Sequence, residues 1–149
     1  VHIVNQTNMI KQVQYRFRKI DVPQFATFLE NYSDQIKEVS FNTDTRFSFD
    51  KDQNVLSSLI NVAMFNGEKP LLKIELGCYF EMTAESLENI RQDNQYVFEP
   101  GLLVQFASLG YGTLRGVMHE KTMNTPLNRF ILPPLYYGDI VKTPFIIPV

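Results

Sequence analysis

The sequence predicts an α+β domain in which a long, late helix packs on one face of a four-stranded antiparallel sheet. Apolar and polar residues alternate in several stretches of the first half, short turn signals separate these stretches, and one segment of the second half has helical spacing. The chain has 149 residues, which is the size of one ordinary domain. We therefore expect residues 1–149 to form a single domain.

Composition narrows the class of protein further. Apolar residues make up 44% and charged residues 20%, close to the averages of soluble globular domains. The net charge of −2 and the scattered Lys and Arg residues argue against a nucleic-acid partner. The start of the chain lacks the pattern of a signal peptide, no apolar run is long enough for membrane insertion, and the single Cys78 cannot form an internal disulfide. We expect a cytoplasmic protein.

The first strand is expected from Val13 to Ile20, where apolar and polar residues alternate. Pro23 should end it, because proline cannot donate to a strand ladder and restricts the residue before it. Residues 24–34 have weak helical spacing, and a short helix, a turn and an irregular edge all remain open.

Three further strands are expected in succession, at Gln35 to Asp50, Val55 to Phe65 and Leu71 to Met82. Polar residues 50–54 supply the first turn. Asn66-Gly67, a pair that tolerates positive φ, supplies the second. Long strands joined by such short turns form an antiparallel meander, and the first strand completes a four-stranded sheet.

The long helix is expected from Gly101 to Glu120, entered at Pro100, whose fixed φ suits a first helical position. Three glycines lie inside it, and each costs up to about 1 kcal/mol relative to alanine. Something must therefore approach this backbone closely, either the domain's own sheet or a second subunit, and the two are weighted equally. The predicted oligomer interface consists of Leu109, Gly110, Gly112 and Gly116.

The tail after Lys121 combines apolar residues with five prolines, which exclude a long helix or a central strand. A solvated tail would be more polar. We expect it to pack on its own domain, on a sister subunit, or in a groove of the kind that holds a client polypeptide.

Residues for catalysis or metal binding are sparse. The chain has two histidines and one cysteine, far apart in sequence, where a zinc site needs three or four such ligands and a nucleophile needs an oriented base. His119 suits the negative end of the long helix, and Cys78 suits a buried strand. No nucleotide-binding glycine motif is present. We expect no catalytic residue, no metal and no cofactor.

From about Tyr15 to Val141, the sequence resembles the SecB export chaperones and their SecB-like relatives. The matching pieces are the opening strand 17–22, the two strands flanking Phe65-Asn66-Gly67-Glu68, the helix entry Pro100-Gly101-Leu102-Leu103 and the stretch 132–137. The order and spacing of these pieces carry the resemblance.

The resemblance implies a four-stranded sheet with helices on one side, assembly into dimers or tetramers, and ATP-independent binding of unfolded polypeptides. It places a groove aromatic at Tyr137, and we predict a polypeptide-binding site of Phe130, Leu135, Tyr136 and Tyr137. Clients would be exported proteins or a dedicated client such as an antitoxin.

Two departures from the family pattern affect the choice of partner. Members that deliver clients to the motor SecA have an acidic outer sheet face and an acidic tail, whereas Arg16 and Arg18 are expected to point outward here and residues 143–149 carry no acidic residue. Binding to SecA is therefore doubtful. The alternative function is a structural or adaptor protein that keeps the fold without binding clients.

Overall fold

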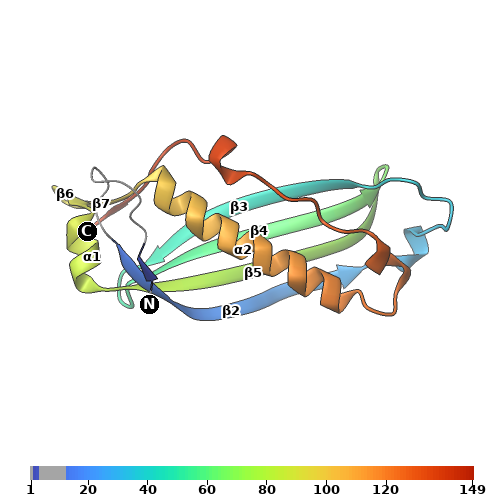
Figure 1. Cartoon of the computed structure of the whole chain (residues 1–149), viewed down its shortest axis with the longest axis horizontal. Coiled ribbons are helices and arrows are strands. Elements are labelled where there is room, and N and C mark those ends of the chain that lie inside the picture. Colours follow the sequence, from blue (N-terminus) through green and yellow to red (C-terminus); the bar gives the residue numbers. More distant parts are fainter. Residues whose placement is uncertain (1, 4–12) are drawn as a thin grey trace.

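The computed structural model describes residues 2–3 and 13–149, and its main feature is a long antiparallel sheet crossed by one helix (Figure 1). The strand order is β1 (His2–Ile3), β2 (Gln14–Thr27), β5 (Lys69–Met82), β4 (Val55–Asn66) and β3 (Ser40–Asp50). Helix α2 (Pro100–Lys121) lies across one face of this sheet. The predicted fold class, four long antiparallel strands with a late helix on one face, is confirmed.

The hydrophobic core lies between α2 and the two central strands. Even-numbered residues from Leu56 to Met64 in β4 and from Leu72 to Met82 in β5 are almost fully buried on the helix side, as the period of two in a strand requires. The ring of Phe106 on α2 stacks on Phe80 with centroids 4.2 Å apart, and Tyr15 meets Phe106 edge-on at 4.7 Å. Paired rings in these geometries stabilise a core beyond their buried area.

The two predicted turns of the meander have the expected backbone. Gly67 has a φ of 61° between β4 and β5, and Asn54 has a φ of 58° between β3 and β4. Glycine and asparagine adopt this left-handed conformation more readily than other residues. Both turns are therefore encoded locally.

Strand β2 continues past the position where we expected it to end. Its pairing with β5 shifts register between Phe17 and Lys19 and again between Asp21 and Gln24, and Pro23 lies within the second irregularity. A bulge leaves residues outside the ladder, so the missing proline N–H is tolerated there. The stop predicted at Pro23 is thus wrong. Residues Leu29–Asn31 then form a short 3-10 helix (η1), and β3 begins at Ser40 rather than Gln35.

A second, smaller sheet stands at one end of the main one. Helix α1 (Ala84–Asn89), with Thr83 as its N-cap, leads into β6 (Arg91–Gln92) and β7 (Gln95–Phe98), and β7 pairs with β8 (Phe145–Pro148). The tail thus contains a short edge strand, which the sequence analysis did not predict. Between α2 and β8 lie the 3-10 helices η2 (Pro126–Arg129) and η3 (Tyr137–Asp139).

Candidate functional site

The segment of residues 130–141, which we call the strap, lies on the helix side of the sheet between α2 and β3 (Figure 1). The Tyr111 hydroxyl donates to the Pro133 carbonyl oxygen at 2.6 Å, and Arg115 Nε donates to the Leu132 carbonyl oxygen at 2.8 Å. The backbone hydrogen bonds found for the strap are local ones. The strap is therefore held by contacts of side chains rather than by strand pairing.

Two strap side chains anchor the segment in the core. Leu132 and Tyr137 are each 1% exposed, and the Tyr137 hydroxyl lies 2.7 Å from Thr45 Oγ1 on β3. The Tyr137 ring also meets the Tyr111 ring edge-on at 6.0 Å. Burial raises the pKa of Tyr137 above its ordinary value, and the hydrogen bond from Thr45 partly offsets this.

The four predicted client-binding residues differ in how much of each side chain is exposed. Tyr136 is 75% exposed, whereas Phe130 and Leu135 are half-buried against the core. Tyr137, expected as a groove aromatic, is instead a core residue, because its ring packs beneath the strap and its hydroxyl hydrogen-bonds Thr45 on β3. In this conformation it offers no surface to another chain.

Two neighbouring aliphatic side chains that sequence reasoning did not single out are also exposed. Ile131 is 68% exposed and Ile140 is 54% exposed. Together with Tyr136 they give the strap an apolar outer surface. No local sequence signal distinguishes these exposed side chains from the buried Leu132 and Tyr137, since apolar residues stand at adjacent positions.

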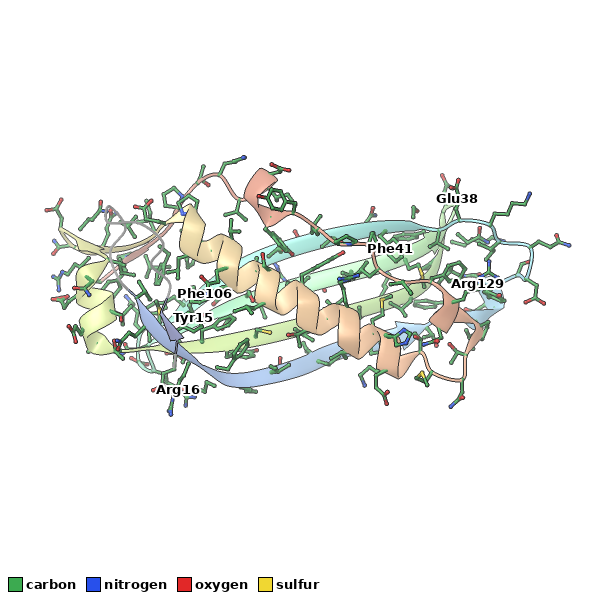
Figure 2. All side chains as sticks on the ribbon, viewed as in Figure 1. Tyr15, Arg16, Glu38, Phe41, Phe106 and Arg129 are labelled. Atoms are coloured by element: carbon green, nitrogen blue, oxygen red, sulfur yellow. The ribbon has the colours of Figure 1, made fainter. Side chains whose placement is uncertain are left out.

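Arg129 fixes the start of the strap, and sequence reasoning missed it. Its guanidinium donates to the Tyr32 hydroxyl at 3.0 Å and to the Ile36 carbonyl oxygen, and it lies 4.6 Å from the ring centroid of Phe130. Figure 2 shows Arg129 at the same end of the molecule as Glu38 and Phe41. Arg129 therefore ties the strap to the segment that precedes β3.

Strand β3 is an edge of the main sheet. It pairs with β4 on one side through eleven consecutive residue pairs with no shift of register, and no other strand of the described chain pairs with it. Phe41, Phe47 and Phe49 are half-buried toward the core, while the alternate side chains are exposed. A long regular edge of this kind is a template for another extended chain.

The glycines of α2 do not share one face. A Cβ atom on Gly110 would lie 2.9 Å from both Ile60 Cδ1 and Ser58 Oγ of β4, so Gly110 permits close packing of the helix on its own sheet. Gly112 and Gly116 have open space around them. The prediction that Gly110 faces a second subunit is therefore wrong, whereas Gly112, Gly116 and the half-buried Leu109 remain predicted interface residues.

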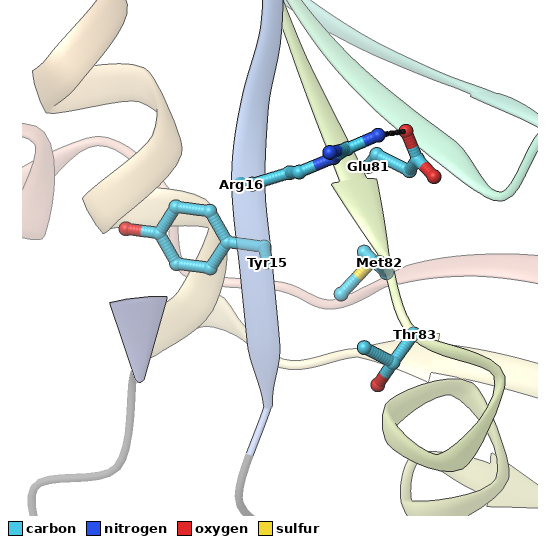
Figure 3. Close-up of a pocket in the computed structure, with 5 residues that line it drawn as sticks. All are labelled: Tyr15, Arg16, Glu81, Met82 and Thr83. Atoms are coloured by element: carbon cyan, nitrogen blue, oxygen red, sulfur yellow. Dashed lines mark hydrogen bonds and ion pairs between the residues drawn. The ribbon is translucent and has the colours of Figure 1, made fainter. Parts of the chain in front are cut away.

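Arg16 and Arg18 lie on the outer face of the sheet, as expected, and they pair there with a carboxylate. Arg16 Nη2 lies 3.0 Å from Glu81 Oε1, and Arg18 Nη1 lies 3.9 Å from the same oxygen. Figure 3 shows Arg16 and Glu81 together, with Tyr15 on the opposite side of β2. A cavity of about 90 Å³ lies beside this pair and is otherwise lined by Tyr15, Met82 and Thr83.

Reactive groups are buried or isolated in the described part of the chain. Cys78 is fully buried, and burial raises the pKa of its thiol to about 11, so the thiol stays protonated at neutral pH. His119 lies in the last turn of α2, as expected. Within residues 2–3 and 13–149, no cluster of His, Cys, Asp or Glu could hold a metal ion, and no helix is long and apolar enough to cross a membrane.

Comparison with known proteins identifies the fold. No known sequence family and no curated protein sequence matches the chain. Among solved structures, the chain is similar to the SecB-like chaperone Rv1957 of Mycobacterium tuberculosis, determined in complex with a ChAD peptide from the Rv1956 HigA1 antitoxin. The match has a TM-score of 0.53 at 12% sequence identity, covering 81% of this chain and 90% of the other. The chain therefore has a SecB-like fold.

Proposed function

We propose that the protein is an ATP-independent holdase that binds extended, non-native segments of other polypeptides. The open, regular edge of β3 carries this proposal. It offers main-chain donors and acceptors to any extended chain, whatever its side chains. A holdase needs such sequence-independent binding together with exposed apolar surface, which the strap supplies through Ile131, Tyr136 and Ile140.

The SecB-like fold supports the same reading. The structural neighbour is a chaperone seen with an antitoxin peptide, which fits a role in holding either unfolded proteins or one dedicated client. Binding of this type consumes no nucleotide. The free energy comes from apolar burial and main-chain pairing, which a cytoplasmic holdase can use without a cofactor.

The decisive experiment measures aggregation. A chemically denatured reporter protein is diluted into buffer without ATP, and light scattering is followed with the protein at stoichiometric ratio. We expect suppression of scattering. Unchanged aggregation across several reporters would favour the alternative function, a structural or adaptor protein with a SecB-like fold.

Tyr136 is the residue with which to test the apolar surface. Because the ring is largely exposed, Tyr136→Ala should weaken binding of an unfolded polypeptide by about 1–2 kcal/mol and leave the melting temperature nearly unchanged. Asp139→Ala, an exposed change on the same strap, is the matched control. Equal affinity for the two variants would move the client surface away from Tyr136.

We further propose self-association through the outer side of α2. Gly112 and Gly116 are four residues apart and exposed, so a second helix could approach this side closely. Two large apolar side chains on β2, Phe17 and Ile20, are 45% and 48% exposed and offer further apolar surface that a second subunit could cover. Gly112→Leu should lower the mass measured by light scattering, and an unchanged mass, or a monomeric parent, would contradict the interface.

Delivery of clients to SecA is not part of the proposal. Asp21 and Glu81 on the outer face both lie near basic side chains of the same chain, Lys19 at 3.6 Å and Arg16 at 3.0 Å. A basic partner would meet two carboxylates that already have counterions. We expect weak or undetectable binding, and submicromolar affinity for SecA at physiological salt would overturn this inference.

A further inference from the structure

The contacts that hold the strap resemble recognition of a bound peptide. Tyr111 and Arg115 donate to two successive carbonyl oxygens, those of Leu132 and Pro133. Carbonyl oxygens occur in every residue, so these donors do not depend on the side chains of the segment that they hold. We call Thr45, Tyr111 and Arg115 the strap seat.

Another segment could reproduce the contacts at the middle of the strap. Pro133 and Pro134 have no N–H group, so the middle of the strap brings no main-chain donors of its own. Leu132 and Tyr137 supply its two most buried side chains, an aliphatic and an aromatic residue five positions apart. Residues five positions apart in a regular extended chain point to opposite faces, whereas the strap turns into η3 at Tyr137. The seat therefore favours two apolar anchors on a segment that bends between them.

Both ends of the strap are fixed independently of the seat. Arg129 ties the start to Tyr32 and Ile36, and β8 ties the following segment to β7 over four residue pairs. Residues 130–141 can therefore leave the seat while both ends stay attached. When the strap is out of the seat, its exposed side chains Ile131 and Tyr136 can also contact apolar side chains of the client.

We propose that the strap is an internal pseudo-client, which occupies the seat until a client segment with the same two anchors displaces it. This inference rests on the proposed holdase function and deepens it. Preferred clients carry a branched aliphatic residue followed, five residues later, by an aromatic one. Thr45 then hydrogen-bonds a tyrosine at the second of these positions. Arg115 and Tyr111 donate to the carbonyl oxygens of the residue at the first position and of the residue after it.

The test uses a fluorescent peptide with the sequence of residues 129–141, and its binding is followed by anisotropy. The parent should bind weakly because its own strap fills the seat. Leu132→Ala removes one strap anchor and leaves the seat intact, so it should bind the peptide at least about tenfold tighter. Asp139→Ala, an exposed change on the same strap that alters neither anchor, is the matched control and should bind like the parent.

A second variant protects the test against misfolding. If Leu132→Ala has no cooperative thermal transition, Tyr137→Phe takes its place, since it removes one hydrogen bond and should tighten peptide binding about two- to five-fold. A peptide with alanine at both anchor positions should not bind. A folded variant that binds the intact peptide no better than Asp139→Ala would show that the strap is a fixed part of the domain.

The outcome also separates this inference from the proposed function. If the parent suppresses aggregation but loosening the strap changes no affinity, the holdase function stands and the pseudo-client is wrong. If loosened variants bind the peptide tightly and no variant suppresses aggregation, the strap is displaceable and the holdase function is wrong.

Discussion

Helix α2 and the strap cover the same face of the sheet and are held there in different ways. The helix satisfies its backbone internally and buries an apolar side that includes Leu103, Phe106 and Leu114. The strap has few backbone bonds and depends on Tyr111 and Arg115 of the helix. We therefore expect the helix to unfold only with the whole domain and the strap to open locally.

The largest expected effect on stability compares a variant in α2 with a variant in the strap. Phe106→Ala should lower the free energy of unfolding by about 3–5 kcal/mol, because it removes the ring stacked on Phe80 at the centre of the core. Leu132→Ala should cost less than is usual for a buried leucine, since the loss is limited by the free energy needed to open the strap. Urea unfolding measures both. Equal losses would mean that strap and helix unfold together.

The two sides of α2 give the next largest effect. Gly110→Val should destabilise the protein by about 1–3 kcal/mol, because the added methyl groups overpack the space between α2 and Ile60. At protein concentrations too low for the proposed self-association, Gly112→Ala should instead stabilise the subunit by up to about 1 kcal/mol, since that position is open within the subunit and alanine favours the helix. Denaturation midpoints test the pair. A loss of stability in Gly112→Ala would indicate that a partner already packs there.

The smallest effect concerns the pH dependence contributed by the strap. The pKa of Tyr137 is raised in the folded state, so the unfolded chain ionises first and stability should fall as pH rises above about 10. Tyr137→Phe removes this contribution and should lose less stability between about pH 9 and pH 11. The variant should cost about 1 kcal/mol at neutral pH through the lost hydrogen bond to Thr45. Parallel pH profiles would contradict the burial of this hydroxyl.

Much of the fold was predictable because its signals are local. β-Branched and apolar residues indicated the strand from Val55, and alternation indicated the strand from Leu71. The Asn66-Gly67 pair indicated a turn, and helical spacing predicted α2 to within one residue at each end. The error at Pro23 has a physical cause. Proline ends a regular ladder, but a bulge on a strand near the sheet edge removes the need for its N–H.

The candidate site was less predictable, because exposure in the tail depends on what the tail lies against. Tyr136 and Tyr137 are identical residues in adjacent positions, yet one is 75% and the other 1% exposed. Nothing in the local sequence indicates which of the two meets Thr45, a residue 92 positions away from Tyr137. Arg129 likewise gains its role only when the segment before β3 lies beside it.

The sequence by itself determined the strands, the helix, their order and the scarcity of groups suited to catalysis, because periodicity and composition act over a few neighbouring residues. Only the tertiary structure decided that β3 is an open edge, that Gly110 faces inward while Gly112 faces outward, and that the tail forms a strap. These features depend on contacts between residues that are far apart in the sequence. The strap has no strand pairing of its own, so its conformation is set by the helix and sheet on which it packs.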